Sequence, residues 1–85
     1  MTNRAPDDDE IATMAREVLI QQMLDDPAAD TVSSGIILPI MGDHGFSHEH
    51  EALLEGPVED IWGRHLKGEI VDPVAAVESI PSSST

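Results

Sequence analysis

The chain contains very few of the large side chains that fill protein interiors. Its 85 residues include one Phe (Phe46), one Trp (Trp62), no Tyr and no Cys. Aromatic side chains bury the most surface per residue, and a domain of this size buries only about 60 to 65% of the surface that its unfolded chain exposes. Disulfides and thiolate metal sites are excluded by the absence of Cys. We therefore expect a thin core that gains stability from a partner chain or a bound metal.

Acidic residues greatly outnumber basic ones. Seventeen Asp and Glu residues face four Lys and Arg residues, which gives a formal net charge of −13. This self-repulsion destabilises a compact monomer in dilute salt, whereas molar salt shortens the Debye length to about 3 Å and screens it. The acidity is therefore either adaptation to a high-salt organism or a carboxylate surface for a basic partner. Direct binding to nucleic acid is not expected, because it requires clustered Lys and Arg.

The segment from Asp7 to Asp26 has the pattern of a long amphipathic helix. Residues 7–10 supply a capping side chain and negative charge for its N-terminus. Apolar residues then recur at the spacing of one helical face: Ile11, Met14, Ala15, Val18 and Leu19. Pro27 ends the helix, because the residue before a proline is steered away from the helical region. The stripe is either a core face or a partner-docking face, and Ile20 lies opposite it.

A dense apolar run occupies the middle of the chain: Ile36, Ile37, Leu38, Pro39, Ile40 and Met41. Its branched side chains and flanking glycines favour a short buried strand. Pro39 lacks the N–H that a sheet ladder needs, so the strand would lie at an edge or be simply extended. We expect a short extended apolar segment, either an edge strand or a simply extended stretch, that is buried in both cases.

The second half of the chain predicts short helices. One covers residues 51–55 and ends at Gly56-Pro57; the next begins at Pro57 and closes at Gly68; the last opens at Asp72-Pro73 and runs to Ile80. The predicted fold class is mostly α: one long N-terminal helix plus two or three short helices around the extended segment. Residues 7–80 form a single small domain, between a polar tail, 1–6, and a Ser-rich tail, 81–85.

Three of the four histidines cluster after the apolar run, and with neighbouring carboxylates they make a candidate metal site: His44, His48 and His50. Imidazole and carboxylate are ligands for zinc, nickel or iron. The spacing from Gly42 to Glu55 resembles the first metal motif of cupins, but no second motif and no series of barrel strands follows, so we do not assign that family. The alternative is a solvated loop whose histidines cap a helix or bond to carboxylates. For His65 we expect a partly buried ring bonded to a carbonyl.

The sequence offers no support for catalysis. Ser47 lacks the glycine signature of a nucleophile, no glycine-rich phosphate loop occurs, and a thin core is a poor place to desolvate an acid or base. We therefore expect a non-enzyme. No run reaches the roughly 18 apolar residues of a membrane span, and the acidic start differs from a secretory signal. The expected location is the cytoplasm or the interior of a virus particle.

Three functions are compatible with these features. The leading hypothesis is a small acidic structural or interaction subunit of a larger assembly, either a virion component such as a capsid, connector or tail protein, or an accessory subunit, from a high-salt organism or its virus. Its predicted interface residues are Ile11, Met14, Val18, Ile36, Ile37, Leu38, Ile40 and Trp62. The second is an acidic inhibitor that mimics nucleic acid through the carboxylates of residues 7–30. The third is a small metal-binding protein that uses the histidine cluster; no other cofactor is expected.

Overall fold

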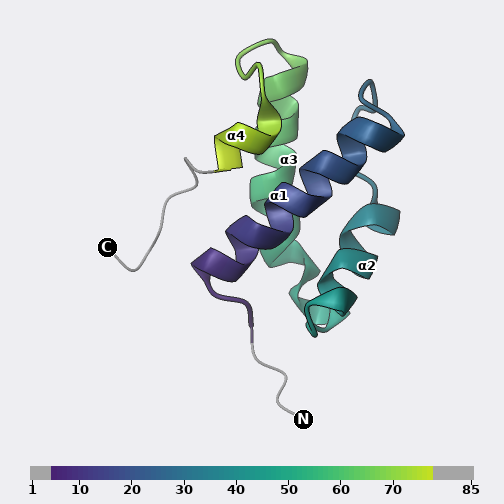
Figure 1. Ribbon diagram of the computed structural model, residues 1–85, viewed down its shortest axis with the longest axis vertical. Helices are drawn as coiled ribbons and strands as arrows, with labels where there is room; N and C mark the ends of the chain where they lie inside the picture. The colour runs from purple at the N-terminus through teal and green to yellow at the C-terminus, as the bar shows by residue number, and fades with distance from the viewer. Residues whose placement is uncertain (1–4, 78–85) are drawn as a thin grey trace.

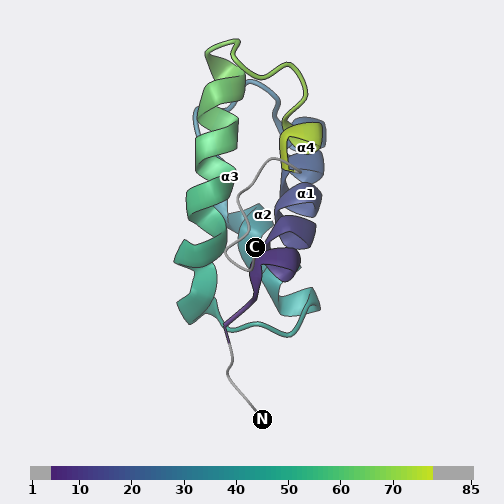
Figure 2. The same cartoon turned by 90° about the vertical axis from the view of Figure 1, so that its left-hand side faces the viewer.

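The computed structural model describes residues 5–77, and these residues form a helical fold. The elements are α1 (Asp8–Asp25), α2 (Ser34–Asp43), a 3-10 turn η1 (His48–His50), α3 (Glu51–Leu66) and α4 (Pro73–Ala76). In Figure 1, α1 crosses in front of α3, with α2 and α4 on either side of it. Figure 2 shows α3 on one side of the molecule and α1 with α4 on the other. The mostly helical fold class is confirmed.

Helix α1 begins and ends where the sequence predicts. Asp7 caps it: its side chain accepts a hydrogen bond from the N–H of Glu10 (2.8 Å), and the N–H of Asp7 donates to the Glu10 carboxylate (2.9 Å). This reciprocal capping box satisfies two backbone donors at the N-terminus. The apolar stripe faces the core, with Met14 and Val18 fully buried. Ile20, opposite the stripe, is 43% exposed.

The prediction of an extended segment or edge strand at residues 36–41 is wrong, because these residues lie within helix α2. No strand occurs in the described part of the chain, residues 5–77. Ser33 caps α2 by accepting from the N–H of Gly35 (3.0 Å). Ile37 and Met41 are both fully buried, whereas Pro39 between them is exposed. A strand would place all three residues on one face, but a helix places only Ile37 and Met41 together. Pro39 removes the hydrogen bond to the carbonyl of Gly35, and Gly35 is an exposed residue.

Helix α3 is one continuous element, so the predicted break at Gly56-Pro57 is wrong. The helix runs through both residues from Glu51 to Leu66. A proline inside a helix costs about 3 kcal/mol, whereas full burial of one large apolar side chain contributes about 1.5–3 kcal/mol. The residues that α3 buries recur at helical spacing on one face: Leu54, Val58, Ile61 and Trp62. Burial of this face outweighs the proline.

Helix α4 begins at the predicted cap. The side chain of Asp72 accepts from the N–H groups of Val74 (3.0 Å) and Ala75 (3.3 Å), and Pro73 occupies the first helical position. The predicted continuation to residue 80 lies outside the described residues. The same holds for the predicted tails, apart from Ala5 and Pro6.

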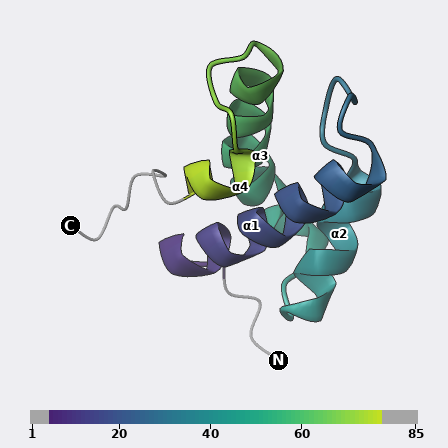
Figure 3. The same cartoon turned by 45° about the horizontal axis from the view of Figure 1, so that its top comes forward.

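The loop between α1 and α2 is fixed by side chains from two helices. Figure 3 shows this loop, residues 26–33, turning back from the end of α1 to the start of α2. Three side chains bond to its backbone: Trp62 Nε1 donates to the carbonyl of Ala29 (2.7 Å), Glu59 accepts from the N–H of Val32 (3.1 Å), and Gln22 accepts from the N–H of Ser33 (3.2 Å). These bonds set the position of α2 against α1.

Two glycines in and after α3 predict opposite effects of substitution. A Cβ at Gly63, inside the helix, would meet no atom within 4 Å, whereas Gly68, just beyond it, has a φ of +85°. Gly63→Ala is expected to raise the free energy of unfolding by about 0.5–1 kcal/mol, because Ala loses less backbone entropy. Gly68→Ala should lower it by about 1–2 kcal/mol, since the left-handed conformation strains a side chain. Urea unfolding measures both, and destabilisation by Gly63→Ala would contradict a continuous α3.

Candidate docking surface

The predicted interface residues divide into a buried group and a partly exposed group. Met14, Val18, Ile37 and Trp62 have no exposed surface and form the core of the chain. The others are half-buried: Ile11, Ile36, Leu38 and Ile40. In this fold, only the half-buried group is accessible to a partner.

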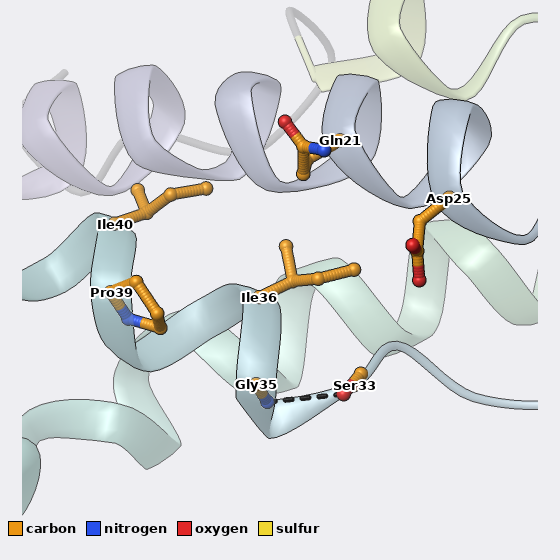
Figure 4. Close-up of a pocket in the computed structure, with 7 residues that line it drawn as sticks. All are labelled: Gln21, Asp25, Ser33, Gly35, Ile36, Pro39 and Ile40. Atoms are coloured by element: carbon orange, nitrogen blue, oxygen red, sulfur yellow. Dashed lines mark hydrogen bonds between the residues drawn. The ribbon is translucent and has the colours of Figure 1, made fainter.

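Ile36 and Ile40 line an open groove between α1 and α2. The groove has a volume of about 540 Å³ and is lined by Gln21, Asp25, Ser33, Gly35, Ile36, Pro39 and Ile40. In Figure 4 the side chains of Ile36 and Ile40 point from α2 towards α1, where Gln21 forms the opposite wall. The groove is therefore apolar along α2 and polar along α1.

Two apolar side chains of α1 that do not line the groove are also exposed. Leu24 is 76% exposed and Ile20 is 43% exposed. Leu24 lies one turn after both Ile20 and Gln21, because residues three or four apart are neighbours on a helix surface. Covering a Leu or Ile side chain fully contributes about 1.5–3 kcal/mol. The described chain does not gain this free energy of burial, because both side chains of α1 remain exposed.

Two carboxylates of α1 lie near the groove, and Asp25 is the one among its lining residues. Asp25 lines the end nearest the start of α2. At the other end of α2, His44, which caps its C-terminus, donates from Nε2 to the Glu17 carboxylate (2.8 Å). The two helices therefore run antiparallel, and eight residues of α1, or about 12 Å, separate Glu17 from Asp25. We name the groove, these two carboxylates and the exposed Ile20 and Leu24 the α1–α2 face.

The negative charge of Asp25 interacts unfavourably with the dipole of helix α1. Asp25 lies in the last turn of α1, which contains no basic residue. The C-terminal end of a helix carries partial negative charge, so a carboxylate there costs about 0.3–1 kcal/mol. No Lys or Arg lines the groove. Arg16, five residues before Gln21, lies on a different side of α1.

The predicted metal site is not assembled as a set of ligands. His44 pairs with Glu17, and His50 Nε2 lies 3.6 Å from the Glu49 carboxylate. His48 is exposed at the start of η1. Among residues 5–77, no group of three or more His, Asp or Glu side chains is placed to hold a metal ion.

The fourth histidine has the arrangement that the sequence predicts. His65 Nδ1 donates to the carbonyl of Ile70 (2.9 Å), and its half-buried ring lies 5.4 Å from that of Trp62. This ring closes the turn after α3. It is a structural residue within the described chain.

A second surface depression lies along the C-terminal half of α3, and it is polar. It is lined by Glu59, Asp60, Gly63, Arg64, Lys67 and Glu69. Asp60 and Arg64 form an ion pair at 3.3 Å, both side chains being more than half exposed. Such a pair between exposed groups contributes about 0.3–0.5 kcal/mol. This depression combines both signs of charge with little apolar surface. It is therefore a weaker candidate for a docking site than the α1–α2 face.

Comparison with known proteins identifies no relative. No family model matches the sequence, and neither the curated proteins nor the solved structures gave a significant match. Within the described residues, none of the helices has both the length and the apolar character that crossing a bilayer requires. The function is therefore argued from the geometry of the chain itself.

Proposed function

We propose that the protein is a small acidic interaction subunit that joins a larger assembly, a virion or a multi-subunit complex inside the cell, by binding a basic protein partner. The observation that supports this proposal is the α1–α2 face. It combines uncovered apolar side chains, above all Leu24 at 76% exposure, with two carboxylates and no cation in the lining of the groove. A basic, partly apolar protein surface complements both properties.

Charge favours a different protein over a second copy of this chain. Each copy carries a formal net charge of −13, so self-association would bring two strongly like-charged bodies together. Like charges that face each other across an interface cost several kcal/mol, whereas opposite charges accelerate and orient association. The partner is therefore expected to present Lys and Arg around an apolar centre.

The geometry gives less support to the two alternatives. A nucleic-acid mimic needs closely spaced charges, because each DNA strand carries one phosphate per about 3.4 Å along the axis. That alternative rests on the carboxylates of residues 7–30. The two of them on the α1–α2 face, Glu17 and Asp25, are about 12 Å apart along α1, so this face does not supply such a row. A metal-binding role would rest on His44, His48 and His50, which the described chain does not bring together as ligands. We propose no enzymatic activity.

Zero-length cross-linking tests the proposal. A carbodiimide joins carboxylates to lysine amines, and this chain has seventeen carboxylates but a single lysine, Lys67. Treatment of the cells or particles that naturally contain the protein should give a discrete adduct with a lysine-rich partner. Mass spectrometry then identifies the linked carboxylates. Recovery of the chain only as an uncrosslinked single copy, at both low and high salt, would contradict the proposed function.

A further inference from the structure

We infer that the α1–α2 face binds one amphipathic α-helix of the partner, with Lys or Arg at both ends of its apolar stripe. This inference rests on the proposed function, since it specifies the partner segment that the basic protein would present. It uses three observations: the helical walls of the groove, the uncovered apolar side chains and the spacing of the two carboxylates.

The walls of the groove favour a helix over an extended peptide. An extended segment binds by main-chain hydrogen bonds to an exposed strand edge, and residues 5–77 contain no strand. Both walls are helices, whose backbone groups are engaged in their own hydrogen bonds except near the ends. A bound helix satisfies its own backbone and needs only side-chain contact. Two packed helices lie about 8–10 Å apart, which leaves a groove between their ridges for a third.

The apolar residues define where the helix lies. Ile36 and Ile40, one turn apart on α2, form one wall. Leu24 does not line the groove, but it is exposed on α1 next to the lining residues Gln21 and Asp25. A partner helix with apolar residues at i, i+3 or i+4, and i+7 presents one stripe along this line. The half-buried isoleucines and the 76% exposed Leu24 would lose their remaining contact with water.

The two carboxylates define the charges at the ends of that stripe. Glu17 and Asp25 are eight residues apart on α1, or about 12 Å, and a partner helix covers the same distance in eight residues. Cations about seven or eight positions apart on the partner would therefore lie near both carboxylates, of which Glu17 already accepts a hydrogen bond from His44. Asp25 also gains most from a cation, because no basic residue in the last turn of α1 offsets its unfavourable position.

Synthetic peptides test the helix directly. The probe is a dye-labelled peptide of Leu and Lys, on the order of 18 residues long so that a helix can form, with Leu at i, i+3, i+4 and i+7. One control has the same composition in an order without a stripe, and another has a central proline. Fluorescence anisotropy at fixed salt should give a dissociation constant about tenfold lower for the amphipathic peptide than for either control.

Matched variants locate the binding. Leu24→Ser, at a side chain that contributes little to the core, and the double variant Ile36→Ser/Ile40→Ser should each weaken binding about tenfold, as truncation of a central contact does. Leu53→Ser on α3, 45% exposed in the wild type, is the apolar control. Asp25→Asn should weaken binding several-fold and reduce its salt dependence; exposed Glu69→Gln is the acidic control. Circular dichroism confirms that each variant is folded, and Leu24→Ser alone suffices if the double variant is not.

Three results would overturn the inference: equal affinity for the amphipathic and reordered peptides, equal affinity for the proline peptide, or equal losses in Leu24→Ser and Leu53→Ser. The cross-linking experiment separates this inference from the proposed function. Partner adducts at Glu17 or Asp25 support both. Adducts confined to carboxylates elsewhere, such as Glu55 or Glu69, would support the proposed basic partner. They would exclude this groove as the site where that partner binds.

Discussion

Replacement of Trp62 by Ala is expected to abolish the cooperative unfolding transition of the protein at room temperature. Trp62 is the largest fully buried side chain, and its indole Nε1 also holds the α1–α2 loop through the carbonyl of Ala29 at 2.7 Å. Truncation of a buried Trp to Ala costs about 3–5 kcal/mol. Domains are stable by about 0.05–0.15 kcal/mol per residue, which is roughly 4–13 kcal/mol for the 85 residues of this chain, so a loss of this size removes much of the stability.

Trp62→Phe separates the two contributions of the indole. It retains an aromatic ring in the core but leaves the carbonyl of Ala29 without its donor, which costs about 1–3 kcal/mol. We expect a folded variant with a lower urea midpoint, measured by far-ultraviolet circular dichroism. Equal stability of Trp62→Ala and the wild type would show that the core does not depend on this residue, contrary to the structure.

Salt is expected to have the second largest effect. Self-repulsion of thirteen net negative charges opposes the compact state and is screened as the Debye length falls from about 30 Å at 0.01 M to about 3 Å at 1 M salt. Relief of about 2–3 kcal/mol would raise the melting temperature by roughly 10–20 °C in a domain of this size. Calorimetry in sodium chloride between about 0.01 and 1 M measures the shift.

A charge-reduced variant provides the control for this effect. Asp30→Asn, Asp43→Asn and Glu69→Gln change three exposed carboxylates, none of them a helix N-cap. The triple variant should melt higher than the wild type in dilute buffer and show a smaller increase with salt. A melting temperature that is independent of salt would remove the support that the composition gives to a high-salt origin.

The parts of the fold that were predictable from sequence depend on local interactions. Helix α1 follows from the Asp7 cap, a 3.6-residue stripe and the stop at Pro27, all of which act within a few residues. The start of α4 follows from Asp72 and Pro73 in the same way. In both cases the local sequence already favours the helix, and packing against the rest of the molecule stabilises it further.

Helices α2 and α3 were mispredicted because tertiary burial overrides local signals there. A six-residue apolar run does not distinguish a strand from a buried helix. Contact with the rest of the core selects the helix, in which Ile37 and Met41 are buried and Pro39 is exposed. Gly56 and Pro57 are proper stop signals, yet α3 continues because Leu54 and Val58, on either side of them, are buried in the same core.

The α1–α2 face was only partly predictable for a related reason. Ile36 and Ile40 could be singled out as apolar, and Ile20 as lying off the stripe of α1. Their association with Leu24 and Asp25 requires the antiparallel packing of α1 against α2, which the loop bonds and the Glu17–His44 pair fix. No spacing along the chain encodes that arrangement.

The bond between Trp62 and Ala29 gives the protein an intrinsic optical reporter. Trp62 is the only tryptophan in the chain, and its indole is both in the core and bonded to the loop that carries α2. The wavelength of the Trp62 emission therefore reports whether this loop remains in contact with Trp62, and no attached label is needed. Loss of the loop contact and loss of core packing would both change this fluorescence. The Trp62→Phe variant, which contains no tryptophan, gives the background fluorescence to be subtracted.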